Sequence, residues 1–147
     1  MPRAKEPRSA SFLRVTLGGR ESIGVFREIS GFSSQTEVTE LEEVDEKGRR
    51  VIRRVPGALK SGNIMLKRGV DTNRALWEWR RQAEEEGPDK ARADGVIELL
   101  DSEGGVIAGY KFRQGWPIKY EGLTLDAASN DVAIETVEIA HEGFERT

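Results

Sequence analysis

The chain has 147 residues, which is the length of one ordinary domain. It contains no cysteine and a single histidine, His141, so disulfides, thiolate metal sites, cysteine nucleophiles and a histidine-rich metal centre are all excluded. Its 23 basic and 26 acidic residues give a formal net charge of −3, whereas a protein that coats nucleic acid normally carries a basic excess. The 16 glycines follow no collagen period, which is typical of a chain with many turns between short strands.

The beginning of the chain, residues 1–10, is polar and rich in Pro, Arg and Lys. We expect it to be a flexible segment ahead of a single domain that covers residues 11–147. No apolar run is as long as the core of a signal peptide, about 7–15 residues, or a membrane span of about 20. The sequence therefore predicts a protein without a signal peptide that is made in the cytoplasm and does not enter a membrane.

Two segments with alternating apolar residues open the domain. Residues 11–17 and 23–30 each place apolar side chains on one face, which predicts two strands. Gly18 and Gly19 indicate a turn between them, and Gly31 breaks or bends the chain after the second.

Residues 35–57 predict a hairpin arm whose first strand is acidic and whose second strand is basic. A turn at 45–48 joins the strands, and Pro56-Gly57 is expected to end the hairpin. One register pairs Glu43 with Arg50, and a register slipped by two residues pairs Glu42 with Arg53; both satisfy the charges. Neither face is cleanly apolar, so the arm is either a solvated hairpin or a piece that pairs with other subunits. Its charged residues are Glu40, Glu42, Glu43, Arg49, Arg50, Arg53 and Arg54.

One helix is expected, over residues 72–86. A strand is expected at residues 62–68, before the helix. Asp71 is a suitable N-cap for the helix, and Gly87-Pro88 is a strong signal for its end. Apolar residues at helical spacing form a stripe that should pack on the sheet, namely Leu76, Trp79 and Ala83.

Strand signals return after the helix. Residues 95–101 and 106–113 predict a hairpin, Gln114-Gly115 interrupts it, and residues 116–121 alternate again. Pro117 implies an edge strand, a strand start or a bulge. The last strand, about 131–141, changes phase at Glu135-Thr136, which predicts either a bulge or a strand that leaves one packing environment for another. The expected core or structural residues are Leu76, Trp79, Trp116, Pro117 and Ile134.

Together, these predicted elements indicate a mainly β fold. It is an antiparallel β-barrel or sandwich of about seven or eight strands, with the 72–86 helix packed on its outer side.

The residues that could carry chemistry are better explained by structure. His141 and Glu142 lack a nucleophile motif, and the sequence has no glycine-rich phosphate loop. The acidic pair Glu42-Glu43 alternates faces in a strand opposite arginines, so it does not form a two-carboxylate site. No catalytic, cofactor-binding or metal site is therefore expected, and the chain is interpreted as a structural or interaction protein.

Three segments resemble, in the same order, the tail tube protein of contractile phage tails and phage-tail-like contractile injection systems. They are FREISGF at 26–32, PGALKSGNIMLKRGVDTNRALW at 56–77 and WPIKYEGLTLDAASNDVAIETVEIAHEG at 116–143. The last is the most specific, and Phe32 stands where the family usually has Leu. The resemblance covers about residues 11–145.

The resemblance implies a tail-tube-like fold with its helix on the outer side, and a homo-hexameric ring. Rings would stack into a tube inside a contractile sheath, and strands of all six subunits would form one inner barrel around the lumen. Implied partners are the sheath, baseplate and terminator proteins, with cargo or DNA passing through the lumen without sequence specificity. The expected location is a virion or another contractile particle, extracellular or intracellular.

Within that frame, we expect the seven charged residues of the hairpin to make subunit and inter-ring contacts. Four helix residues are expected to face the sheath, namely Arg74, Glu78, Arg81 and Glu85. The alternatives are a tube initiator or terminator paralogue, a secreted hexameric ring carrier related to the type VI secretion tube protein, and, last, a hydrolase.

Overall fold

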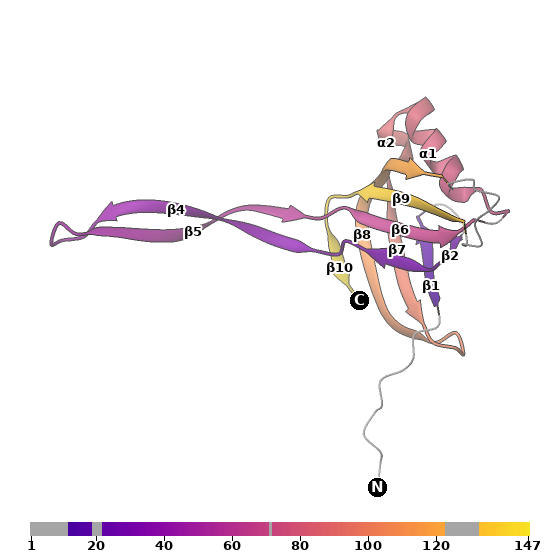
Figure 1. The fold of residues 1–147 in the computed structure, drawn as a ribbon, viewed down its shortest axis with the longest axis horizontal. Helices are drawn as coiled ribbons and strands as arrows, with labels where there is room; N and C mark the ends of the chain where they lie inside the picture. The colour runs from indigo at the N-terminus through magenta and orange to yellow at the C-terminus, as the bar shows by residue number, and fades with distance from the viewer. Residues whose placement is uncertain (1–11, 19–21, 71, 123–132) are drawn as a thin grey trace, which may run out of the picture.

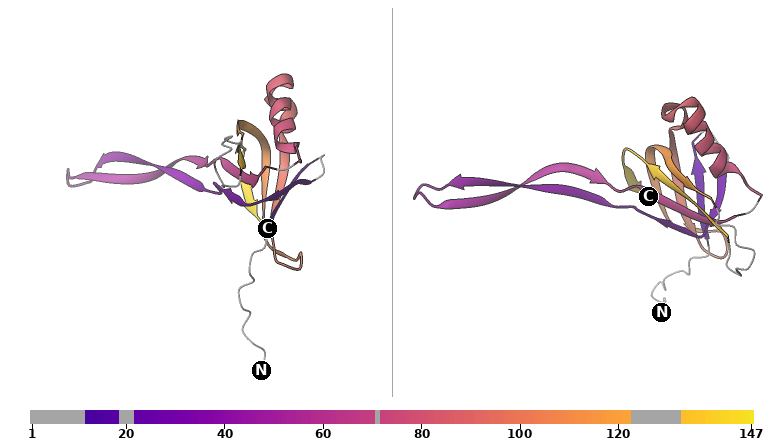
Figure 2. Two further views of the ribbon diagram at one scale, coloured as in Figure 1. Left: turned by 45° about the vertical axis from the view of Figure 1, so that its right-hand side comes forward. Right: turned by 45° about the horizontal axis from the view of Figure 1, so that its top comes forward.

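The computed structural model describes residues 12–18, 22–70, 72–122 and 133–147, and it consists of a curved β body and a long two-stranded arm (Figure 1). Two further views show the arm projecting away from the body (Figure 2). The elements in chain order are β1 (Phe12–Leu17), β2 (Ser22–Phe26), β3 (Glu28–Ser30), β4 (Ser34–Val44), β5 (Arg50–Ser61), β6 (Ile64–Gly69), α1 (Ala75–Glu86), α2 (Pro88–Ala91), β7 (Ala93–Leu100), β8 (Val106–Glu121), β9 (Ile134–Ala140) and β10 (Phe144–Arg146).

The sheet of the body closes on itself. Its strands lie in the order β2-β1-β7-β8-β9-β6-β3, with β10 also on β8, and all these pairings are antiparallel. The two ends of that order, β2 and β3, are separated in the chain by Arg27 alone. The Arg27 amide donates to the carbonyl of Lys67 on β6 (2.9 Å), so β2 and β3 act as one bent strand that joins β1 to β6. The mainly β, antiparallel fold expected from the sequence is confirmed.

Strand β8 is the longest in the body and changes partner along its length. Its first part pairs with β7 and β10, and its second part, from Trp116, pairs with β9. The expected interruption at Gln114-Gly115 is wrong, because Gln114 adopts a φ of 52° and bends the strand without ending it. The register with β9 shifts between Pro117 and Lys119. Pro117 therefore lies at a bulge, which is one of the three roles expected for it.

The core lies between the sheet and α1. The helix buries Leu76, Trp79 and Ala83, the stripe expected from the sequence. Trp79 is fully buried, and its indole N–H donates to the carbonyl of Ala91 (2.8 Å), which attaches α2 to α1. Burial of such side chains stabilises the fold by about 1.5–3 kcal/mol each.

Glycine at position 95 is required by packing. The ring of Phe112, which is 1% exposed, lies over Gly95 and Gly115. A Cβ at Gly95 would overlap that ring, so only glycine leaves room for it.

Three expectations about the helix and the last strand need correction. Helix α1 begins at Ala75 and not at 72, because the Asn73 side chain accepts the Ala75 amide (2.9 Å) and holds the preceding residues in a turn. The expected N-cap, Asp71, lies outside the described residues. Ile134 is not a core residue, since it points outward and is 37% exposed, while Trp116 is half-buried and Pro117 is buried.

Of the two alternatives for the phase change at Glu135-Thr136, the bulge is also wrong. Strand β9 pairs with β6 in one unbroken register from Ile134 to Ile139. The apolar residues change phase there because Glu135, a charged residue, occupies an inward position.

Candidate assembly surfaces

The arm (residues 34–61, which are β4, the turn and β5) has a register that neither sequence-based alternative predicts. Val44 lies opposite Arg50 and Glu43 opposite Val51, halfway between the two predicted registers. The turn decides this, because a carboxylate oxygen of Asp45 accepts the amides of Lys47 (2.9 Å) and Arg49 (2.8 Å). That Asx-type loop occupies residues 45–49 and shifts the ladder by one residue.

The expected end of the hairpin at Pro56-Gly57 is wrong as well. Strand β5 continues to Ser61. Between the pairs Thr36–Leu59 and Val38–Pro56, β5 has one residue more than β4, and the register of the ladder shifts there. Strand β4 alone has 11 residues, which corresponds to a length of roughly 37 Å.

The charged residues of the arm pair with one another on the surface. Arg50 reaches diagonally to Glu42 (2.6 Å) and Arg53 to Glu43 (3.4 Å), whereas Arg54 and Glu40 lie opposite each other at 3.9 Å. Arg49 contacts Asp45 in the turn (3.3 Å). Exposed pairs of this kind contribute only about 0–1 kcal/mol, so they can exchange partners when another protein approaches.

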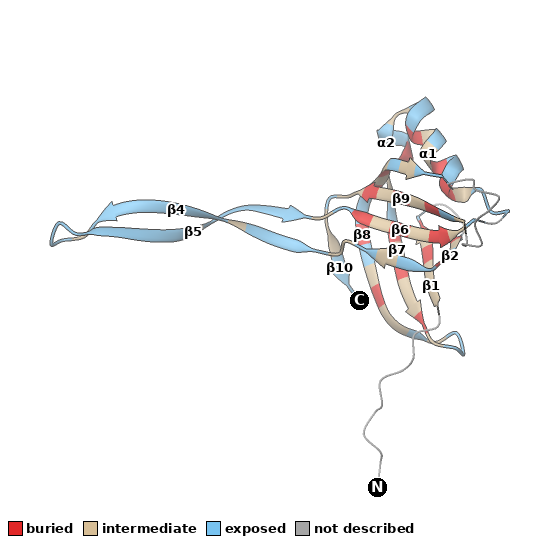
Figure 3. Ribbon diagram, in the orientation of Figure 1, coloured by how far each residue is buried: buried red, intermediate tan, exposed pale blue. Residues whose placement is uncertain are grey.

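Most of the arm is exposed (Figure 3), and its exposed residues include apolar ones on both faces. Residues directly opposite in the ladder share a face. Val44 and Ile52 therefore lie on one face, and Leu41 and Val51 on the other, all between 39% and 69% exposed. An isolated two-stranded ribbon is marginally stable in water, and exposed apolar side chains mark interaction surfaces. The arm thus has the properties of a segment that another molecule covers.

The outer face of α1 is a second candidate surface. Arg74, Glu78, Arg81 and Glu85 are all exposed, and Arg81 pairs with Glu85 and, at 3.8 Å, with Glu84. Trp77 is 37% exposed beside them, with the Arg81 guanidinium 5.7 Å from its ring centroid and the Tyr120 ring 5.4 Å away.

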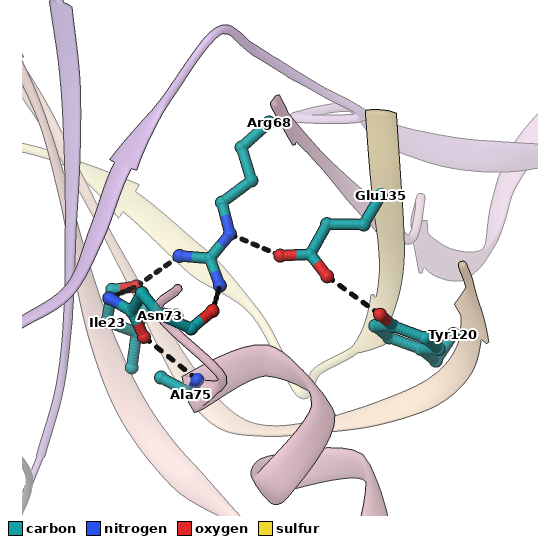
Figure 4. A network of polar contacts seen from close by, with 6 residues as sticks. All are labelled: Ile23, Arg68, Asn73, Ala75, Tyr120 and Glu135. Atoms are coloured by element: carbon teal, nitrogen blue, oxygen red, sulfur yellow. Dashed lines mark hydrogen bonds and ion pairs between the residues drawn. The ribbon is translucent and has the colours of Figure 1, made fainter. Parts of the chain in front are cut away.

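A buried ionic network holds this helix against the barrel (Figure 4). Arg68 on β6 is 3% exposed and Glu135 on β9 is 5% exposed, and they form an ion pair at 2.5 Å. Arg68 also donates to the carbonyls of Ile23 (2.8 Å) and Asn73 (2.7 Å), while the Tyr120 hydroxyl donates to Glu135 (2.7 Å). Burial and the hydrogen bond to Glu135 raise the pKa of Tyr120 to about 12. The network joins β2, β6, β8 and β9 to the turn before α1.

Sequence reasoning missed this network, although a signal was present. Arg68 continues the buried alternation of Ile64 and Leu66 on β6, and Glu135 stands in phase with Val137 and Ile139 on β9. Two opposite charges in phase with core positions on separate strands indicate a buried pair.

The imidazole ring of His141 is held by hydrogen bonds to the backbone. The Gly143 amide donates to its Nδ1 (3.0 Å), so Nε2 carries the hydrogen and donates to the carbonyl of Gly62 (2.8 Å). Both ring nitrogens are thus engaged in joining the end of β9 to the base of the arm. Over the described ranges, His, Asp and Glu form no cluster of three that could hold a metal ion. No helix in the described part of the chain is long and apolar enough to cross a membrane.

The described chain is thus a closed antiparallel barrel with a helix on its side and a long exposed arm. The chain belongs to the family described as T4-like virus tail tube protein gp19, whose model matches residues 10–145. The recognition made from the three sequence segments is therefore confirmed. No curated protein matches the chain.

Several solved structures have the same fold. A chain in the anti-feeding prophage tube terminating cap is 22% identical with a TM-score of 0.75, and 100% of this chain aligns with 95% of that one. A chain in the sheath-tube complex of an extracellular contractile injection system, PVC, is 22% identical with a TM-score of 0.72, covering 96% and 91%. Hcp1 from Flavobacterium johnsoniae is 18% identical with a TM-score of 0.55, covering 92% and 94%.

Proposed function

We propose that this protein is the inner tube subunit of a contractile injection system or phage tail. Six copies form a ring, rings stack into a tube, and the tube is the conduit inside the sheath. The family membership and the similarity to a chain of a sheath-tube complex support this proposal. The observation that carries it is the arm, which leaves a closed barrel and exposes apolar and charged side chains on both faces.

In this proposal the arm makes the contacts between subunits and between rings. The two ends of the body sheet, β2 and β3, are joined through Arg27, so the long unpaired strand edges within the described residues belong to β4 and β5. An exposed strand edge pairs readily with another chain, and a contact between unlike surfaces propagates into rings and filaments. The residues proposed to make these contacts are Glu40, Glu42, Glu43, Arg49, Arg50, Arg53 and Arg54.

The outer face of α1 would contact the sheath through Arg74, Glu78, Arg81 and Glu85. Exposed charge pairs give weak, salt-sensitive contacts, which suits a tube that slides free when the sheath contracts. Baseplate and terminator proteins would bind the two ends of the tube, and the lumen would pass cargo or DNA without sequence specificity. The particle would be assembled in the cytoplasm.

The test is the variant Arg50→Glu/Arg53→Glu, which leaves Glu42 and Glu43 of β4 without their basic partners. We expect an unchanged melting temperature and no tubes in negative-stain electron micrographs. The matched control, Arg27→Glu/Lys90→Glu, makes the same charge change at exposed positions of the body and should form normal tubes. If the arm variant polymerises like the unmodified protein, the arm is not the assembly element.

Two alternatives remain within the same family. A tube-end paralogue is favoured by the similarity to a chain in a tube terminating cap, and it would form rings that never stack. A secreted ring carrier is favoured by the similarity to Hcp1, and it would form free rings at every concentration. Micrographs of the concentrated protein separate the three outcomes.

A further inference from the structure

The barrel has an apolar opening at one end, which we call the mouth. It is a cleft of about 330 Å³ whose lining includes Leu13, Ile29, Phe32, Leu99, Ala108 and Arg146. Leu13, Leu99 and Ala108 are neighbours across three strands, and Phe32 stacks on Tyr110 at 4.3 Å on the other side. The mouth is therefore the end of the core that the body leaves incompletely covered.

The chemistry of the mouth is apolar with one free cation at the rim. Arg146 on β10 forms no ion pair with any described residue, whereas most arginines of the body are paired. A cleft of this size lined by apolar groups with one oriented charge is the usual form of a binding site.

The tip of the arm has the complementary chemistry. Val44 is 69% exposed, the most exposed apolar side chain near the turn, and Glu46 follows it two residues later. Glu46, like Arg146, makes no ion pair within the described part of the chain, because Asp45 holds the turn and pairs with Arg49. The tip thus offers one apolar side chain and one free anion, and Lys47 beside that anion also forms no ion pair with a described residue.

The arm cannot deliver its tip to the mouth of its own chain. It projects away from the body, with the tip at the far end from the barrel (Figure 1). A length of roughly 37 Å is comparable with the diameter of a body of about 100 residues, so the tip reaches across a neighbouring molecule.

We propose that the tip of the arm, through Val44 and Glu46, occupies the mouth of a second copy of this chain, where Glu46 pairs with Arg146. This inference rests on the proposed function and names the surface that receives the arm. The contact joins unlike surfaces, so each bound pair still has one free tip and one free mouth, and binding repeats from copy to copy.

The absence of native cysteine allows a direct test by cross-linking. In the variant Val44→Cys/Ala108→Cys, oxidation of the assembled protein should give a ladder of disulfide-linked oligomers that reduction returns to monomer. The matched control is Val44→Cys/Val96→Cys. Val96 lies next to Ile97 on β7 and therefore faces the opposite surface of the same sheet, so this variant should give no ladder.

A charge exchange tests the same contact without oxidation. Arg146→Glu and Glu46→Arg should each raise the protein concentration needed for assembly about fivefold, and the double variant should restore it. The inference is overturned if tubes form but the Val44→Cys/Ala108→Cys ladder is absent or no stronger than the control, or if the double variant is no better than the singles. The proposed function survives those results, whereas a protein that never assembles contradicts both.

Discussion

The buried pair of Arg68 and Glu135 gives the most quantitative prediction about the fold. Replacement of Arg68 by Met keeps most of the volume of the side chain but removes its donors to Glu135 and to the carbonyls of Ile23 and Asn73. Among the described residues, the Glu135 carboxylate, 5% exposed, then keeps only the Tyr120 hydroxyl as a partner.

The expected loss of stability follows from the uncompensated charge. Removal of one member of a buried ion pair costs about 3–5 kcal/mol, a large part of the 5–15 kcal/mol that stabilises a typical domain. For a domain of this size, that corresponds to a melting temperature lower by roughly 6–20 °C. The triple variant Arg68→Met/Glu135→Leu/Tyr120→Phe removes every charge and should lie close to the unmodified protein.

Urea unfolding followed by tryptophan fluorescence measures this loss, because Trp79 is fully buried in the folded protein. A costly unpaired charge is contradicted if Arg68→Met changes the free energy of unfolding by less than about 1 kcal/mol. It is also contradicted if the triple variant is as unstable as the single one, since the loss would then come from packing and not from the unpaired charge.

Three further predictions concern packing, pH and the sheath contact. Gly95→Ala should destabilise the fold by about 1–3 kcal/mol or more, because the new Cβ overlaps a buried ring. Gly122→Ala, whose Cβ would make an ordinary van der Waals contact with the Tyr120 ring at 3.6 Å, should change it by less than about 0.5 kcal/mol in the same urea titration. The folded-state pKa of Tyr120, about 12, lies above its unfolded value near 10, so its contribution is complete below pH 10 and is lost as the pH rises toward 12. Stability measured at about pH 9 and pH 11.5 should therefore fall more in the unmodified protein than in Tyr120→Phe. Arg74→Glu/Arg81→Glu should leave tubes intact but reduce their co-sedimentation with a co-expressed sheath protein; equal co-sedimentation would contradict a sheath contact at α1.

Local patterns predicted the strands and the helix stripe because each depends on near neighbours in sequence. Alternation placed β1, β2, β6 and β7, and helical spacing placed the buried side chains of α1. The closure of the barrel could not be predicted, since it depends on the single residue Arg27 pairing with Lys67 far along the chain.

The arm shows why register is harder than strand content. Charge pairing satisfied two registers equally, and the actual one follows from the Asp45 side chain in the turn. Seven charged residues of the arm were named from sequence, and their role in contacts stays a prediction; the pair of Glu37 and Lys60 was not among them. Its exposed apolar residues and the mouth were not, because exposure depends on which parts of the chain remain uncovered after folding.

The continuity of β8 likewise depends on a local backbone conformation that the residue types did not indicate. A Gln-Gly pair normally marks a loop, but the left-handed conformation of Gln114 turns the strand while its pairing continues. Ile134 was assigned to the core by its apolar character, yet β9 places it outward because Glu135 faces Arg68.

The most direct test of the tube proposal is negative-stain electron microscopy of the concentrated protein beside a variant in which residues 35–60 are replaced by Asn-Gly, a two-residue hairpin turn. Strands β4 and β5 end opposite each other at Ser34 and Ser61, so the body should still fold. We expect six-fold rings stacked into tubes for the full chain, and monomers with a cooperative melting transition for the shortened one. A full-length protein that stays monomeric at every concentration, or a shortened protein that still forms tubes, would contradict the proposal.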